Sequence, residues 1–446
     1  MENDSYMDTQ KTSYQQLVGS DFRWYKSRRI VILNLWIFLL LVTSTANGYD
    51  GSMMNGLQLI DQWEVSFNHP SGSKLGLLSA IQNIGTVGSQ PISPYLCDGL
   101  GRKRTIFIGA VLMVAAAVIQ TASQTVEMFI GARFLLGFGL GICTSAAPLL
   151  VTELAHPTQR GPLSSVYNAF WPVGAVVYVT GYIDSGGKKI TFEFRASWVT
   201  FGTFHINNSW SWRIPSAAQA LPSLLQVFLI LLCPESPRWL ISKGRDSEAL
   251  QVLAYYHANG STLDPLVLFE FQEIKTAIEK EREQKQTGWI QLVRTPGNRR
   301  RMRIIIAIAL FSQWSGNGIA AFYGMAYSPL IVLYTLEILP FSIRAKGYAI
   351  FAFTVSASLV FNQYINPVAL TAMGWKYYIV YCAWIGFELG YVYLFLVETR
   401  NRTLEETALI FDGLYNSNNE VTGKISETQN KDEKETSHSE IMLTNP

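Results

Sequence analysis

The feature that most constrains this chain of 446 residues is a series of long apolar blocks separated by polar runs. A helix needs about 20 mostly apolar residues to cross a bilayer, where its backbone must satisfy its own hydrogen bonds. The residues are 49% hydrophobic and only 15% charged, and the charged share is well below that of typical soluble domains. The sequence therefore predicts an all-α membrane protein.

The blocks form two groups around a long polar stretch. We expect a cytoplasmic N-terminal tail (1–29) without a cleavable leader, and a disordered cytoplasmic tail (412–446). Between them we expect a six-helix half (30–233), a cytoplasmic helical linker (234–303) with helices at 247–258 and 265–285, and a second half (304–411). The expected membrane blocks are 30–47, 75–96, 105–123, 128–152, a broken block at 163–204, 217–233, 304–339, 345–370 and 377–397.

The placement of basic residues orients these blocks. Lys and Arg gather on the cytoplasmic loops of membrane proteins. Here they precede the first block, separate the second from the third, follow the fourth and end the linker, which places the N-terminus in the cytoplasm. The residues concerned are Arg23, Lys26, Arg28, Arg29, Arg102, Lys103, Arg104, Arg160, Arg299, Arg300, Arg301 and Arg303.

Charge and residue usage argue against several kinds of function. The net charge of +2, with no basic stripe, predicts no nucleic-acid partner. The four cysteines lie in or beside apolar blocks without close pairing, so we expect buried side chains rather than a metal site or disulfides. The five histidines are scattered, and no nucleophile–base pair or phosphate loop is recognisable, so we expect neither an enzyme nor a cofactor.

Short motifs mark the cytoplasmic ends of the blocks. Residues 98–104 read D-G-L-G-R-K-R, in which the glycines permit a tight turn and the charges can pair or bind helix ends. Residues 153–160 and 337–344 each carry an acid, a proline and an arginine in that order, an echo between two halves. Residues 234–239 read P-E-S-P-R-W. The motif residues singled out are Asp98, Gly101, Arg102, Glu153, Arg160, Glu235, Arg238, Glu337 and Arg344.

Together and in this order, the motifs over about residues 30–410 resemble those of the sugar-porter family of the major facilitator superfamily. Residues 48–51 (G-Y-D-G), 312–318 (S-Q-W-S-G-N-G) and 361–364 (F-N-Q-Y) are similar to its fungal lactose-permease-like and hexose-transporter branch. The resemblance implies a major facilitator bundle on a twelve-span plan. It also implies proton-coupled uptake of a mono- or disaccharide by alternating access, with gating at the cytoplasmic motifs. We expect a monomer in the plasma membrane, with sugar, proton and the lipid bilayer as its partners.

Asp50 and Arg133 are the candidate proton-coupling residues. Each lies within an apolar block, where a charged side chain is costly unless it is paired or neutralised. In the family that the motifs resemble, the matching acid and base form a coupling pair, and protonation of the acid releases the base. A static structural ion pair is the alternative.

Amide side chains are the candidate sugar ligands, because one amide offers a hydrogen-bond donor and an acceptor to hydroxyl groups. Gln313 and Asn317 lie in the stretch where the family contacts sugar, although Ser312 stands where the family often has a second glutamine. Asn168 stands where the family commonly has glutamine, and Asn362 is a further polar group in a predicted span. Trp171, Trp314, Tyr323 and Trp384 could cover the apolar face of a sugar.

Two departures from the family pattern change the expected architecture. Residues 178–195 carry five charges inside the fifth block, so we expect them to loop out of the membrane. Gln313 and Glu337 are only 24 positions apart, whereas two whole spans intervene in the family. Block 304–339 then forms a short hairpin that turns near Gly324, and the twelve-span plan is reduced to about ten membrane segments.

The shortened second half leaves other functions open. A non-transporting sugar sensor is one alternative, although such proteins usually carry a cytoplasmic extension longer than residues 412–446. An inactive, truncated transporter is another, because alternating access requires two halves that rock around a central site.

Overall fold

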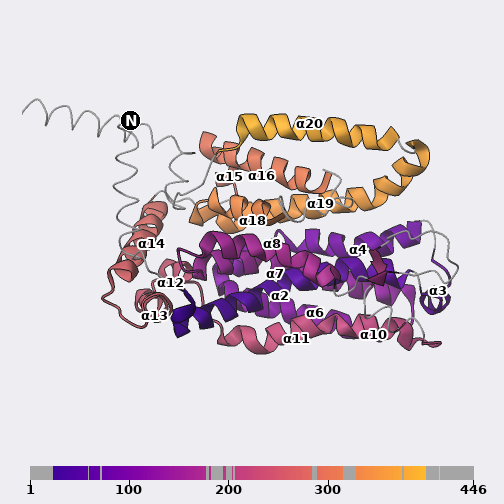
Figure 1. Ribbon diagram of the computed structural model, residues 1–446, viewed down its shortest axis with the longest axis horizontal. Coiled ribbons are helices and arrows are strands. Elements are labelled where there is room, and N and C mark those ends of the chain that lie inside the picture. Colours follow the sequence, from indigo (N-terminus) through magenta and orange to yellow (C-terminus); the bar gives the residue numbers. More distant parts are fainter. Residues whose placement is uncertain are drawn as a thin grey trace, which may run out of the picture.

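In the computed structural model the chain forms a bundle of long helices that run side by side (Figure 1). The structure describes residues 24–58, 60–70, 73–176, 180–181, 194–196, 203, 206–283, 289–314, 328–373, 376–397 and 411. One layer of the bundle comes from the first half of the chain, and the other comes from α16, α18, α19 and α20 (Figure 1). The predicted bundle of apolar helices, with a helical loop between its two halves, is confirmed.

The first half supplies the larger layer. The sixth span begins at Trp210, earlier than the expected block 217–233, and it is interrupted at Gln219 between α10 and α11. Pro215 lies inside α10 and Pro222 inside α11. The elements of this half are η1 (Trp24–Lys26), α2 (Arg28–Leu57), α3 (Asp61–Ser66), α4 (Ser73–Ser89), α5 (Ser93–Leu100), α6 (Arg102–Thr121), α7 (Val126–Leu154), α8 (Arg160–Val176), β1 (Thr180–Gly181), β2 (Phe194–Ala196), α10 (Trp210–Ala218), α11 (Ala220–Leu229) and η2 (Ile230–Leu232).

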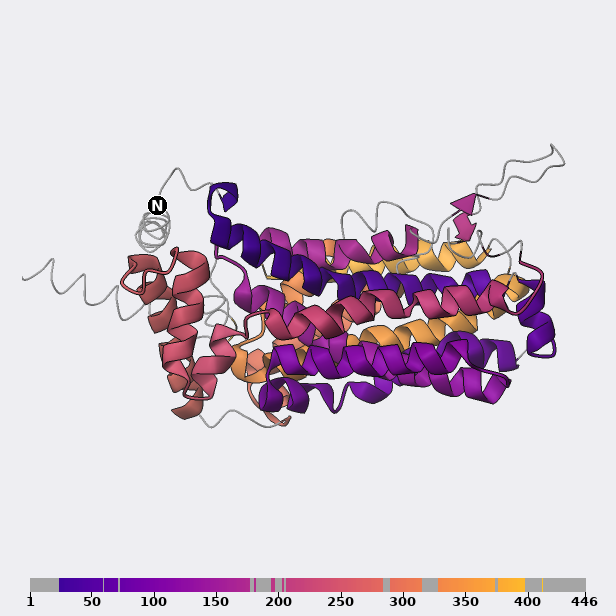
Figure 2. The same ribbon diagram turned by 90° about the horizontal axis from the view of Figure 1, so that it is seen from below.

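The linker forms short helices at one end of the bundle, as both ribbon views show (Figures 1 and 2). Its elements and those of the second half are α12 (Pro237–Ser242), α13 (Asp246–His257), α14 (Pro265–Glu283), α15 (Gln291–Arg294), α16 (Pro296–Trp314), α18 (Ser328–Glu337), α19 (Phe341–Met373) and α20 (Tyr377–Phe395). The helices α13 and α14 correspond to the two that the sequence predicted in the linker. The two layers meet where α19 contacts α4 and α7, and where α18 contacts α8.

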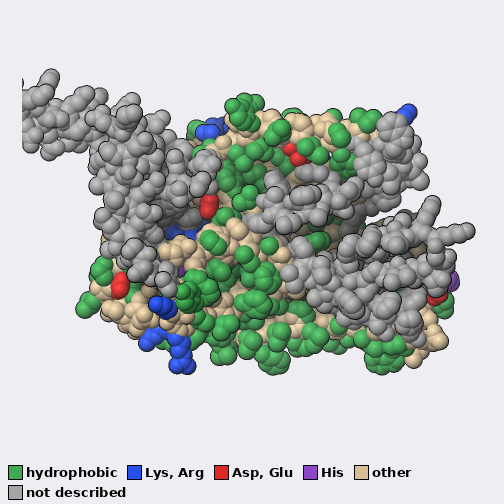
Figure 3. Space-filling view, viewed as in Figure 1, with side chains coloured by type: hydrophobic (Ala, Val, Ile, Leu, Met, Phe, Trp, Pro, Cys, Tyr) green, Lys and Arg blue, Asp and Glu red, His purple; other side chains and the backbone are tan. Residues whose placement is uncertain are grey.

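The outer surface of the bundle suits a lipid environment. The described part of one face is largely hydrophobic, and most of the Lys and Arg in view lie toward the linker end (Figure 3). Among the described residues, five helical stretches are long and apolar enough to cross a membrane by themselves, and Ile379–Phe395 is a shorter apolar helix. These five are Arg28–Gly51, Arg102–Thr121, Val126–Leu154, Trp210–Leu232 and Ile343–Asn362.

One expectation about the cysteines was wrong. Cys97, Cys143 and Cys233 are buried, but Cys382 is exposed. Cys382 lies on α20, which forms the outer edge of the second layer and leaves much of its surface uncovered by other helices (Figure 1).

The two unusual segments are only partly described. β1 and β2 pair antiparallel, with Gly181 opposite Phe194, so the two ends of the inserted run meet. This pairing is compatible with a run that loops out of the bundle, but residues 182–193 lie outside the described residues. The expected turn near Gly324 also lies outside them, although α16 and α18 on either side of it contact each other.

Glycines bring α4 and α7 into backbone contact. A Cβ atom built on Gly137 would lie 1.9 Å from the carbonyl oxygen of Gln82, and one on Gly85 would lie 2.2 Å from the carbonyl oxygen of Phe134. Gly141, one turn beyond Gly137, is equally confined by Ser89. Small residues at a spacing of four allow helices in lipid to approach so closely. This interface fixes the distance between side chains that α4 and α7 present to each other.

We expect Gly137→Leu to separate α4 from α7, because the new side chain has no space beside Gln82. Overpacking of a tight interface typically costs about 1–3 kcal/mol or more. The melting temperature and the monodisperse yield of the purified protein should both fall. Gly131→Leu is the matched control on α7, since a Cβ at Gly131 meets nothing within 4 Å. Equal behaviour of the two variants would contradict this account of the interface.

Candidate functional site

The buried acid and base of the first half lie close together without forming an ion pair. Asp50 on α2 is 2% exposed and Arg133 on α7 is 1% exposed. Each lies near enough to act electrostatically on the other. Within the described part of the chain, however, no Asp50–Arg133 contact falls within the 4.0 Å that defines an ion pair. Arg133 Nη2 instead donates a hydrogen bond of 2.7 Å to Gln82 Oε1 on α4.

A hydrogen bond from Tyr49 ties this part of α2 to the broken sixth helix pair. The Tyr49 hydroxyl donates to the carbonyl oxygen of Pro215 at 2.7 Å. That carbonyl is available because α10 ends at Ala218, and the N–H of the following Gln219 is directed to the Ala217 carbonyl oxygen rather than to that of Pro215. The residue next to Asp50 is therefore anchored by the irregular backbone that the prolines create.

The structure brings two of the four candidate sugar ligands together. Gln313 is buried on α16, and Asn362 on α19 donates from Nδ2 to the Gln313 carbonyl oxygen at 2.7 Å. The Trp314 and Trp384 rings lie beside this contact, with centroids 5.3 Å apart. Asn168 lies on α8, but its side chain is outside the described residues, as is the whole of Asn317.

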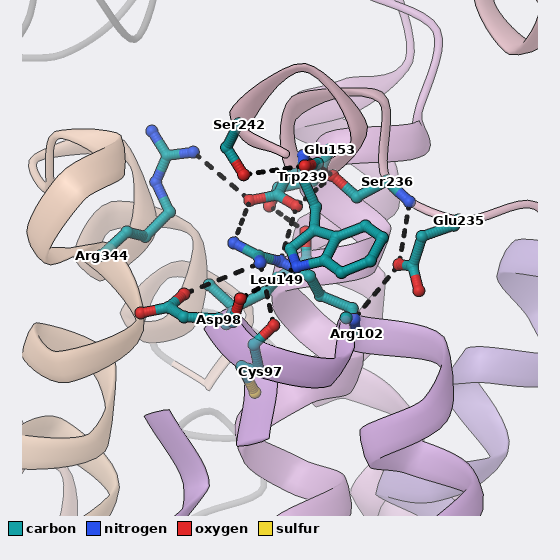
Figure 4. Close-up of polar contacts among 12 residues, drawn as sticks. Cys97, Asp98, Arg102, Leu149, Glu153, Glu235, Ser236, Trp239, Ser242 and Arg344 are labelled. Carbon is teal, nitrogen blue, oxygen red and sulfur yellow. Dashed lines mark hydrogen bonds and ion pairs between the residues drawn. The ribbon is translucent and has the colours of Figure 1, made fainter. Parts of the chain in front are cut away.

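The motifs that the sequence predicts at the cytoplasmic side converge on Glu153, at the end of α7 (Figure 4). Its carboxylate accepts from Arg102 Nε at 3.1 Å and from the Ser236 hydroxyl at 2.5 Å. Arg344 from the second half approaches it to 3.8 Å. Arg102, Glu153 and Arg344 are all almost completely buried, so Glu153 joins both halves of the bundle at this end.

Glu235 binds the start of α6. Its carboxylate accepts from the backbone N–H groups of Arg102, Lys103 and Ser236. Burial raises the pKa of Glu235, and the hydrogen bonds from the backbone oppose that rise. Gly101 makes this approach possible, because its φ of 96° is in the left-handed region and a Cβ there would lie 2.4 Å from Glu235 Oε2.

The remaining motif residues take separate places around this network. Asp98 lies 3.7 Å from Arg102 Nη1, and its carbonyl oxygen accepts from the Trp239 ring. Arg238 is buried on α12, and Glu337 ends α18. Arg160 begins α8 and acts electrostatically on His156 and Glu270.

A histidine cluster joins the linker to α7, and the sequence did not reveal it. His257 Nδ1 lies 2.7 Å from Glu270 Oε2, and its Nε2 lies 3.3 Å from the Leu154 carbonyl oxygen. The His156 ring packs edge-on against His257, with centroids 5.1 Å apart. Burial and the neighbouring His257 lower the pKa of His156 to about 3. Burial alone would raise the pKa of Glu270, but the charge of His257 and its hydrogen bond outweigh that effect and lower it.

We expect Glu153→Gln to destabilise the protein, because the buried Arg102 and Arg344 would both lose the carboxylate that lies between them. Removal of one partner of a buried ion pair costs about 3–5 kcal/mol. The melting temperature of the purified protein should fall clearly. Glu248→Gln is the control, since the Arg245–Glu248 pair is exposed and such pairs contribute about 0–1 kcal/mol. An equal, small effect of both changes would refute the central role of Glu153.

We expect acid to loosen the contact between linker and bundle. His156 keeps its neutral form in the folded protein, whereas the unfolded chain takes up a proton near its ordinary pKa of 6.5. The stability that His156 contributes is therefore present above pH 6.5 and is lost as the pH falls below it. Glu270 adds a loss of the same sign below its ordinary pKa of 4.5.

His156→Leu should reduce the fall in melting temperature between about pH 7 and pH 5. His69→Leu, at an exposed histidine, should leave that fall unchanged. An unaltered pH dependence in His156→Leu would show that the buried ring does not control acid stability.

Comparison with known proteins assigns this architecture to a family. The family model described as "Sugar (and other) transporter" matches residues 36–324 and 318–411. The break in the match falls between α16 and α18, where the sequence predicts that part of the second half is missing. The MFS glucose transporter mfs1 of Aspergillus flavus is 29% identical over 277 residues, which are 62% of this chain and 50% of that protein.

The arabinose-proton symporter of Bacillus subtilis is 32% identical over 251 residues, 56% of this chain and 49% of its own length. The chain thus spans about half the length of the curated relatives that it matches. Among solved structures, the proton:xylose symporter XylE with bound 6-bromo-6-deoxy-D-glucose is similar with a TM-score of 0.64. At 19% identity, covering 85% of this chain and 99% of that one, it shows the fold alone. The chain is a member of the sugar transporter family of the major facilitator superfamily, a family of multi-pass membrane transporters and not of enzymes.

Proposed function

We propose that this chain carries a mono- or disaccharide into the cell together with a proton, by alternating access and as a monomer in the plasma membrane. The observation that carries the proposal is the buried Asp50 beside the buried Arg133. A charged side chain within the membrane costs several kcal/mol, so such residues generally serve transport or pair with each other. The similarity to glucose transporters and to an arabinose-proton symporter supports the same class of cargo.

In the proposed cycle Asp50 takes up the proton and Arg133 loses its attraction to the neutral acid. The sugar binds between the halves, near the amides of Gln313 and Asn362 and beside Trp314.

 Separation of Glu153 from Arg344 at the cytoplasmic end then lets the two halves part and release the sugar inward.

A second candidate function follows from the break in the family match between α16 and α18. A second half that lacks two spans can retain a sugar site without the movement that transport needs. The alternatives are therefore a non-transporting sugar sensor and an inactive, truncated transporter.

Uptake of radiolabelled lactose or hexose in a transporter-null cell, with and without a protonophore, tests the proposal. Carriage with a proton requires uptake that the protonophore suppresses. Sugar binding without uptake would favour the sensor. A protein that showed no sugar binding and no uptake would favour the inactive, truncated transporter.

We expect Asp50→Asn to abolish accumulation of sugar against a gradient, because the amide cannot take up and release a proton. Concentrative uptake should fall about tenfold or more, within the range of typical coupling between two sites. Asp61→Asn, at an exposed aspartate on α3, is the matched control and should behave as the wild type does. Unchanged accumulation by Asp50→Asn would remove Asp50 from the coupling mechanism.

A further inference from the structure

Gln82 is the one polar side chain that holds Arg133 among the described residues. The hydrogen bond from Arg133 Nη2 to Gln82 Oε1 is 2.7 Å long, and both side chains are buried. Arg133 Nε and Nη1 and Asp50 Oδ2 make no hydrogen bond within the described structure. The guanidinium is thus held by a neutral oxygen although a carboxyl group lies nearby.

The Asp50 carboxylate and the Gln82 amide oxygen are acceptors of different strength for Arg133. A carboxylate attracts a guanidinium with a full opposite charge, whereas an amide oxygen offers only a dipole, so a charged Asp50 would compete well for Arg133. A neutral Asp50 would not compete, and a buried guanidinium without any acceptor would be costly. Gln82 supplies an acceptor that carries no charge and therefore does not oppose the return of Arg133 to Asp50.

The backbone fixes Gln82 at this distance from Arg133. Arg133, Gly137 and Gly141 follow one another at intervals of four on α7, and Gly137 packs directly on the Gln82 backbone. The Thr86 hydroxyl, one turn along α4, donates to the Gly137 carbonyl oxygen at 3.0 Å. Gln82 therefore faces Arg133 because of the glycine interface.

No other charged group in the described residues acts on this pair. Asp50 and Arg133 are each the only charged group that influences the other. The contacts from α8 and α10 to this part of α2 come from Gly174 and Trp171, beside Tyr49 and Gly51, and from Pro215, beside Tyr49, and none of the three carries a charge.

We propose that Gln82 is a positioning residue that receives Arg133 when Asp50 is protonated, so that Arg133 alternates between two partners on α2 and α4. The inference rests on the proposed proton-coupled function. It adds a defined position for the Arg133 guanidinium when Asp50 is protonated.

Sugar uptake as a function of external pH tests the transport part of the proposal. In Gln82→Leu, Arg133 has only Asp50, so the half-maximal pH of uptake should move about one unit toward acid, the scale of a nearby opposite charge. The sugar KM should stay unchanged. Gln82→Glu offers a permanent carboxylate to Arg133 and should flatten the pH profile.

Gln90→Leu is the matched control, because Gln90 is a buried amide of the same segment that contacts Ser145 and Thr86 instead of Arg133. A wild-type pH profile in Gln82→Leu, or equal shifts in Gln82→Leu and Gln90→Leu, would overturn the proposal.

A double-mutant cycle in the purified protein separates this inference from the proposed function. Asp50→Asn mimics the protonated acid, so Gln82→Leu should lower the melting temperature more in that background than in the wild type. Additive losses would refute the role of Gln82. If the losses are not additive but the protein shows no proton-dependent uptake, the exchange of Arg133 between Asp50 and Gln82 stands and the proposed transport is refuted.

Discussion

Close backbone contact between helices is the constraint on which this bundle depends. Helices in lipid gain little from apolar contact with each other, since lipid tails are as apolar as their side chains. The contact between α4 and α7 is made instead by Gly85, Gly137 and Gly141. The helix α8 approaches α2 in the same way, because a Cβ on Gly174 would lie 1.9 Å from the Thr45 carbonyl oxygen. These approaches set the positions of the buried polar groups.

The buried charges of the first half depend on this packing. Arg133 is one turn from Gly137, and its hydrogen-bond partner Gln82 has the backbone that Gly137 touches. Asp50 lies beside Tyr49, which the Pro215 carbonyl holds in place. The candidate coupling site is thus assembled from α2, α4 and α7, with α10 as a support.

The end of the bundle that carries the linker uses ion pairs, whereas Arg133 is held by a single hydrogen bond. Glu153 contacts Arg102 of the first half and Arg344 of the second, while Ser236 at the start of the linker donates to the same carboxylate. His257, which contacts Glu270, attaches the linker helices to the end of α7 through the carbonyl oxygen of Leu154, the residue after Glu153. An acid at the end of one helix therefore connects the first half, the second half and the linker.

The sequence by itself determined the membrane bundle, its two halves and the family, because apolar block length and the order of the cytoplasmic motifs are local properties of the chain. It also identified Asp50 and Arg133, since a charge within an apolar block is visible without a structure. It did not identify Gln82, His257 or Glu270, whose residue types are common and whose importance comes from their neighbours. It was wrong about Cys382, because the exposure of a residue on an apolar helix depends on which side of the bundle that helix occupies. Only the tertiary structure decided that Arg133 is held by Gln82 and that Glu153 joins both halves, since both contacts connect helices far apart in the sequence.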